Sequence, residues 1–137
     1  MGWTFYNSSG QQLKATADKA ATQAEMEAVT STTAYATPGR TQYHPGVLKG
    51  WASVASDGTL YEGYNVTSSG RDGTGDYNVV WATDFSNTTY SFVGMTSTSG
   101  ISDIHRNNHT AGQLDVKTYA SGSLTDSDFC VQVAGDQ

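Results

Sequence analysis

The chain has 137 residues, of which only 21 are Leu, Ile, Val or Phe, and its formal net charge is −6. So few of these large apolar residues would indicate disorder only in a highly charged chain. Charged residues make up only 15% of this one, and aromatic residues, which disordered chains lack, make up 11%. The composition therefore excludes a disordered chain, and an acidic pI of about 4.7 with only seven Lys and Arg predicts no nucleic-acid partner. No run approaches 18 apolar residues, so we also expect no membrane insertion.

Residues 1–45 are expected to form a separate N-terminal segment with one short strand and one short helix. The strand is indicated by aromatic residues that precede a turn-forming Asn-Ser-Ser-Gly run: Trp3, Phe5 and Tyr6. Thr22 and Glu25 have the spacing of a capping box, which predicts a helix over residues 22–29. Two turn signals follow: Pro38-Gly39 and Pro45-Gly46.

Residues 46–137 are expected to form a second domain built from β-strands. Apolar runs separated by Gly, Ser, Asp and Asn clusters, including a predicted loop at 68–75, indicate seven strands: 47–55, 59–67, 75–83, 89–97, 100–106, 113–120 and 127–134. Alternation assigns three sets of residues to buried faces: Tyr77, Val79 and Trp81; Leu114 and Val116; Phe129, Val131 and Val133. Short strands without intervening helices predict an all-β fold, a jelly-roll-like antiparallel β-sandwich. The alternative, a β-helix or fibrous repeat, would require a fixed period, which is not visible.

The sequence has no strong catalytic signature, so we do not expect an enzyme. There is no Gly-x-Ser-x-Gly elbow, which would position a nucleophilic serine. Cys130 lies between Phe and Val in a predicted strand, and we expect it to be a buried, inert thiol.

Three polar motifs have the residue types of metal sites. His105 and His109 lie four residues apart, a spacing that suits zinc on a helix, but Asn107-Asn108 between them favours a polar loop tip. The acidic runs 72–76 and 126–128 could attract calcium, yet neither has the spacing of a calcium-binding loop, and Asp-Gly is a common turn dipeptide. We therefore expect neither a metal nor a cofactor.

Exposed aromatic faces beside carboxylates would suit a sugar ligand. Six aromatic residues of the second domain are candidates for such a platform: Trp51, Tyr61, Tyr64, Trp81, Tyr90 and Tyr119. A chain short of aliphatic residues also needs aromatic residues for its core, so for any one of the six we favour a place in the core or in a subunit interface.

Three segments resemble those of bacteriophage tail fibres. The first, Ala21–Ala28 followed by Thr37–Arg40, is similar to an A-T-x-A-E-x-x-A segment and a T-P-x-R segment that precede the distal region of such fibres. The second, Gly75–Tyr90, is similar to the G-x-Y-x-V-x-F-x-T-x-F-x-x-x-x-Y pattern of their C-terminal knob domains, with Trp81 in place of the usual Phe. The last five residues, Val133–Gln137, also resemble the end of such fibres.

This resemblance implies a homotrimeric β-sandwich tip on an upstream tail-fibre shaft. Such a tip belongs to the virion, has no catalytic residues, and binds a bacterial surface receptor, often a glycan and otherwise a protein. The short helix would form a collar around the three-fold axis. The shortage of aliphatic residues also favours a trimer, because three copies can bury sheet faces against one another.

The resemblance transfers no binding residue, so the candidates rest on physical grounds. Polar, hydrogen-bonding loop tips on a stiff scaffold are typical contact sites, and we expect receptor contacts at Arg71, Asp72, Arg106, Asn107, Asn108 and His109. Two alternatives remain open. One is a carbohydrate-binding module of a bacterial surface protein, resembling the trimeric H-type lectins, and the other is a virion decoration protein without a receptor.

Overall fold

The computed structural model describes residues 5–6, 8–9, 12–13, 20–31, 34–44, 46–97 and 103–137. Contacts within the chain divide it into two compact units, Met1–His44 and Pro45–Gln137. We describe each unit by itself, as unit 1 and unit 2.

Unit 1 contains two short strands and two short helices. These are β1 (Phe5–Tyr6), β2 (Gln12–Leu13), α1 (Gln23–Ala28) and α2 (Pro38–Thr41), and β1 pairs with β2 in antiparallel orientation. The predicted strand is confirmed at its described residues, whereas Trp3 lies outside them.

The capping box at the start of α1 is confirmed. The backbone N–H of Thr22 donates to Glu25 Oε2 at 2.8 Å, and the backbone N–H of Glu25 donates to Thr22 Oγ1 at 3.2 Å. The helix ends where Val29 adopts a left-handed conformation, with φ of 51°. The turn predicted at Pro38-Gly39 is wrong, because Pro38 instead begins the single turn of α2, where its fixed φ suits the first helical position. Pro45 lies outside the described residues.

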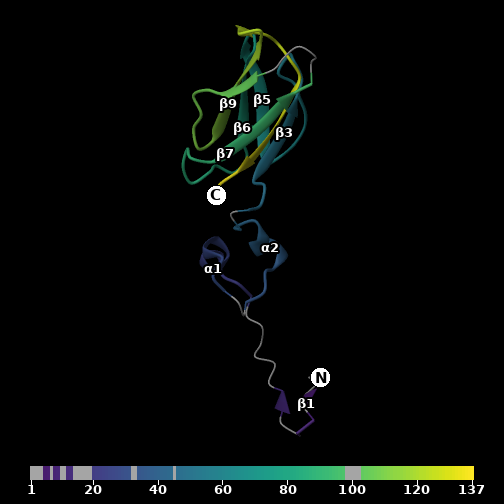
Figure 1. Ribbon diagram of the computed structural model, residues 1–137, viewed down its shortest axis with the longest axis vertical. Coiled ribbons are helices and arrows are strands. Elements are labelled where there is room, and N and C mark those ends of the chain that lie inside the picture. The colour runs from purple at the N-terminus through teal and green to yellow at the C-terminus, as the bar shows by residue number, and fades with distance from the viewer. Residues whose placement is uncertain are drawn as a thin grey trace. The chain divides into compact units, whose positions relative to one another are not determined.

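Unit 2 is an all-β sandwich of two antiparallel sheets, as predicted (Figure 1). One sheet has four strands in the order β4-β3-β11-β7, formed by β3 (Gly50–Val54), β4 (Leu60–Tyr64), β7 (Ser91–Thr96) and β11 (Phe129–Ala134). The other has the order β10-β9-β6-β5, with β8 also paired to β9. Its strands are β5 (Val66–Gly73), β6 (Asp76–Trp81), β8 (Asp103–Arg106), β9 (Gln113–Ala120) and β10 (Ser123–Leu124).

The core lies between the two sheets, and all three alternating sets predicted to be buried form part of it. Twelve buried residues make up this core: Ala52, Val54, Tyr77, Val79, Trp81, Phe85, Tyr90, Leu114, Val116, Phe129, Val131 and Val133. The ring of Tyr77 on β6 packs against that of Phe129 on β11, with the ring centroids 5.0 Å apart. Aromatic side chains therefore supply much of the apolar contact between the sheets, which explains how a chain with few aliphatic residues forms a core.

The predicted strand at 59–67 is confirmed over Leu60–Tyr64 but not beyond, and the predicted loop at 68–75 is wrong. The chain turns at Asn65, whose φ is 59°, so that β4 ends at Tyr64 and β5 continues to Gly73. The turn is fixed because the backbone N–H of Thr83 donates to Asn65 Oδ1 at 2.7 Å and Asn65 Nδ2 donates to the Thr83 carbonyl at 3.1 Å. The polar residues of β5 are tolerated in a strand because β5 lies at the edge of its sheet.

The two ends of the sandwich are distinguished by where the preceding chain joins it. At the first, the backbone N–H of Lys49 donates to the Val133 carbonyl at 2.9 Å, and Gly50 lies against Trp81. The preceding chain therefore joins the sandwich there, at what we call the entry end. At the other, the far end, β3 finishes at Val54 opposite Phe129. Figure 1 shows the segment between β9 and β11, in yellow-green and yellow, at the end away from the C-terminus.

Candidate functional site

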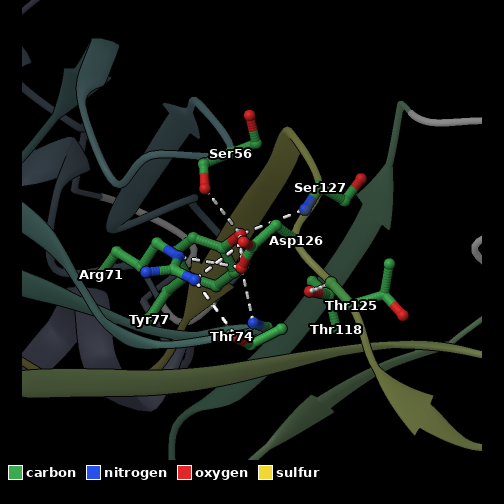
Figure 2. Close-up of polar contacts among 9 residues, drawn as sticks. Ser56, Arg71, Thr74, Tyr77, Thr118, Thr125, Asp126 and Ser127 are labelled. Carbon is green, nitrogen blue, oxygen red and sulfur yellow. Dashed lines mark hydrogen bonds and ion pairs between the residues drawn. The ribbon is translucent and has the colours of Figure 1, made fainter.

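Polar segments from both sheets meet at the far end of unit 2. They are the β3–β4 turn at 55–59, the β5–β6 turn at 74–75 and the segment 121–128 before β11. Tyr77 is the first of the buried residues of β6, and its hydroxyl lies at this end. The segments are therefore connected through a side chain whose ring is packed in the core (Figure 2).

Arg71 and Asp126 form a two-pronged ion pair between β5 and the segment before β11. Arg71 Nε donates to Asp126 Oδ1 at 2.9 Å, and Arg71 Nη2 donates to Asp126 Oδ2 at 2.8 Å. Asp126 Oδ1 also accepts from the backbone N–H of Gly75 at 2.7 Å. The Arg71 guanidinium, followed by the Gly75 amide, lowers the pKa of the Asp126 carboxyl, and the same pairing raises the pKa of Arg71.

The Tyr77 hydroxyl links three of the segments at this end. It accepts from the backbone N–H of Ser127 at 3.1 Å and lies 3.0 Å from the Ser56 carbonyl and 3.3 Å from Asp126 Oδ1. Tyr77 and Ser127 are both fully buried, and burial raises the pKa of the Tyr77 phenol. This oxygen therefore satisfies a backbone donor that water cannot reach.

The β5–β6 turn approaches the segment before β11 too closely for a side chain. Gly75 has φ of 61°, and a Cβ atom there would lie 2.6 Å from the Thr118 carbonyl oxygen and 2.6 Å from the Thr125 nitrogen. Thr118 holds this segment, because its hydroxyl donates to the Thr125 carbonyl at 2.6 Å. Glycine is required here for both its conformation and its size.

An exposed aromatic ring lies beside this network. Tyr61 on β4 is 62% exposed, and its hydroxyl donates to Asp128 Oδ2 at 3.3 Å. The other carboxylate oxygen of Asp128 accepts from the backbone N–H of Ser56 at 2.8 Å. The negative charge of Asp128 is the main cause that raises the pKa of Tyr61. We call Tyr61, Asp128 and Ser56 the far-end platform.

Two of the six residues predicted to contact a receptor, Arg71 and Asp72, lie at this end, but not on a loop. Both belong to β5, so the prediction that they form a loop tip is wrong. The Arg71 side chain is ion-paired with Asp126, and both carboxylate oxygens of Asp72 accept from Asn78 Nδ2, at 3.0 and 2.9 Å. A polar sequence at a sheet edge is difficult to distinguish from a loop, because the ladder hydrogen bonds that define the strand involve only the backbone.

Of the other four predicted residues, Asn107, Asn108 and His109 lie towards the entry end, whereas Arg106 is level with Arg71 across the sheet. Arg106 is in β8, and Asn107 and Asn108 follow it as exposed residues before β9. The His109 ring nitrogens lie 3.2 Å from the Asn107 carbonyl and 2.6 Å from the Thr88 carbonyl. The His109 ring also meets the edge of Tyr90, a core residue, so it connects two loops. The structure therefore separates Asn107, Asn108 and His109 along the sandwich from the other three predicted residues.

The six candidate sugar-facing aromatic residues also separate. Trp81 and Tyr90 are in the core, as favoured, whereas Tyr61 and Tyr64 are exposed by 62% and 54%. The pairing of Arg71 with Asp126 was missed because the two residues are 55 positions apart, and no local pattern connects them.

The expectation for Cys130 is wrong, because this residue is exposed. Phe129 and Val131 point into the core, so Cys130 between them must face outwards on the pleated strand. The alternation of β11 was therefore a better guide than its apolar neighbours. In the part of the chain that the structure describes, no three His, Cys, Asp or Glu residues are grouped to hold a metal ion.

No protein-family model, curated protein or solved structure matches this chain. Within the described ranges, no helix has the length and apolar character needed to cross a bilayer.

Proposed function

We propose that this chain is the distal tip of a bacteriophage tail fibre, a homotrimer in the virion that binds a bacterial surface glycan. In this proposal, unit 2 carries the receptor site on its far-end platform, and the shaft precedes it in the chain. The protein acts by binding and not by catalysis.

The observation that carries the proposal is the position of the platform. The chain enters unit 2 beside Val133, whereas Tyr61 and Asp128 lie at the end of the sandwich away from that entry. An adhesin mounted at its entry end would present its far end to a cell surface. Flat aromatic faces with an adjacent carboxylate suit sugars, because the ring covers apolar C–H groups and the carboxylate accepts from hydroxyls.

The network around Tyr77 supports the proposal by making the platform rigid. Ser56 is held from both sides, since its carbonyl accepts from Tyr77 and its N–H donates to Asp128. A site that is already ordered loses little conformational entropy when a ligand binds. Three such sites on one trimer gain avidity even when each is weak.

An array of bacterial surface glycans tests this proposal with two matched variants. Tyr61→Ala should reduce glycan binding by about thirtyfold, which corresponds to about 2 kcal/mol for a central aromatic contact. Tyr64→Ala is the control, because it removes an exposed ring of the same strand that lies closer to the entry end. Equal binding by wild type and Tyr61→Ala would contradict the far-end site, and a wild type that binds no glycan would contradict the ligand class.

The loop predicted from the sequence provides a second comparison. The combined change of Asn107, Asn108 and His109 to Ala alters a loop towards the entry end, and the far-end proposal expects glycan binding to be retained. Loss of binding in this variant, with Tyr61→Ala unaffected, would instead support the sequence prediction. The carbohydrate-binding module remains the alternative function, since it would use the same platform without a fibre shaft.

A further inference from the structure

The two sheets of unit 2 differ sharply in charge. The four strands of the β4-β3-β11-β7 sheet contain a single charged residue, Glu62. The strands of the other sheet contain seven: Arg71, Asp72, Asp76, Asp103, Arg106, Asp115 and Lys117. One sheet is therefore nearly uncharged in a chain whose net charge is −6.

The β4-β3-β11-β7 sheet also carries two large apolar side chains that are exposed, both on β7. Val93 and Met95 are exposed by 67% and 70%, and they lie opposite Gln132 and Cys130 of β11 on the outward face. With Gly94, these residues line a shallow depression of about 230 Å³. We call Val93, Gly94, Met95, Cys130 and Gln132 the β7–β11 patch. It lies at one margin of the sheet, because β7 is an edge strand.

We infer that the β7–β11 patch is the contact surface for a second copy of this chain. The inference rests on the proposed homotrimer and names the face that assembles it. Adjacent exposed apolar residues on an edge strand are a typical association surface, because both the side chains and the unpaired backbone can gain partners there.

Charge favours another copy as the occupant over a different partner. Each copy has a net charge of −6, so copies repel one another where their charged surfaces meet. The β4-β3-β11-β7 sheet has one charged residue on its strands, so the fewest charged groups lose their hydration when two copies meet there. A highly charged partner would instead find its ionic contacts at the other sheet, whose strands carry four Asp residues together with Arg71, Arg106 and Lys117.

The size of the patch indicates how far the contact extends. A stable interface contains about 20–30 residues on each side, more than the patch supplies. The outward row continues from Gln132 of β11 to Trp51 of β3. We therefore expect the contact to extend from β7 along this row to β3.

Light scattering of the full chain at micromolar concentration tests the inference with one charge added to each face. Met95→Glu should convert a three-chain particle to single chains, with an unchanged far-ultraviolet circular dichroism spectrum. Leu124→Glu is the matched control, because Leu124 is 40% exposed on β10 of the other sheet, and this variant should remain three-chain. Val93→Glu repeats the test at a second position if Met95→Glu does not fold.

The Cys130 thiol gives a readout in the wild-type protein. Its modification by N-ethylmaleimide should be at least about tenfold slower in the wild-type particle than in single chains of Met95→Glu, because a thiol within an interface is inaccessible. The labelling rate in urea gives the value for the fully accessible thiol.

The outcomes separate this inference from the proposed function. Wild-type trimers that persist in both Met95→Glu and Val93→Glu, with Cys130 freely labelled, would overturn the inference and leave the trimeric adhesin intact. A wild type that is a single chain, with Cys130 labelled at its accessible rate, would overturn both this inference and the trimer. Glycan binding through Tyr61 is measured independently in either case.

Discussion

Replacing Tyr77 with Phe removes one buried oxygen atom and leaves the aromatic ring that packs on Phe129. In the wild type, that oxygen accepts from the N–H of Ser127 at 3.1 Å and is 3.0 Å from the Ser56 carbonyl. Ser56 is exposed, so its carbonyl can bind water instead. Ser127 is fully buried, so its N–H would lose its partner without replacement by bulk water.

The cost of Tyr77→Phe follows from this one unsatisfied donor. A buried polar group left without a hydrogen-bond partner costs about 1–3 kcal/mol. In a domain of this size, 1 kcal/mol lowers Tm by about 4–8 °C, so we expect Tm to fall by at least about 4 °C. Scanning calorimetry at a fixed protein concentration measures the change.

Tyr61→Phe is the matched control, because it removes the same atom from an exposed tyrosine whose hydroxyl contacts Asp128. We expect its Tm to equal that of the wild type. If Tyr77→Phe also melted at the wild-type temperature, the Tyr77 hydroxyl would not be the link that holds the far end, and the rigid platform would lose its main support.

Three further changes test other parts of the sandwich. Asp126→Asn should be less stable than wild type at about pH 6 and similar to it at about pH 2, as measured by urea denaturation. The reason is that the folded-state pKa of Asp126 lies below the ordinary 3.8, so the charged carboxylate stabilises the fold above that pH. This contribution is lost as the pH falls through the folded-state pKa. Gly75→Ala should destabilise unit 2 more than Gly122→Ala in the same assay. Both glycines have positive φ, but a Cβ atom would clash with neighbouring backbone only at Gly75, since no atom lies within 4 Å of a Cβ at Gly122. Equal losses of stability would show that the close approach at Gly75 is relieved. Phe129→Ala should lower the free energy of unfolding by about 3–5 kcal/mol, and a loss below about 1 kcal/mol would mean that the two sheets do not depend on its contact with Tyr77.

Much of the fold could be predicted from the sequence where the signal is local. Alternation along β6 identified Tyr77, Val79 and Trp81 as buried, because neighbouring side chains of a strand point to opposite faces. The capping box of Thr22 and Glu25 was equally visible, since both partners lie within one helical turn.

The predictions failed where polar residues adopt regular structure. Residues 68–73 are rich in Ser, Gly and charge, yet they form most of β5 because their backbone pairs with β6. Asn65 ends β4 by adopting a left-handed conformation, which its side-chain hydrogen bonds to Thr83 support. Neither the pairing nor those bonds can be seen within a short window of sequence.

The sequence by itself determined the class of fold, eight of the twelve core residues and the capped helix, because each depends on periodicity or on residues within one turn. Only the tertiary structure decided what the polar residues do. It paired Arg71 with Asp126 across 55 positions, placed Tyr61 beside Asp128 and separated the loop at 107–109 from Arg71 along the sandwich. The physical reason is that buried apolar side chains are specified by their own strand, whereas a polar side chain is specified by a partner that the fold brings to it.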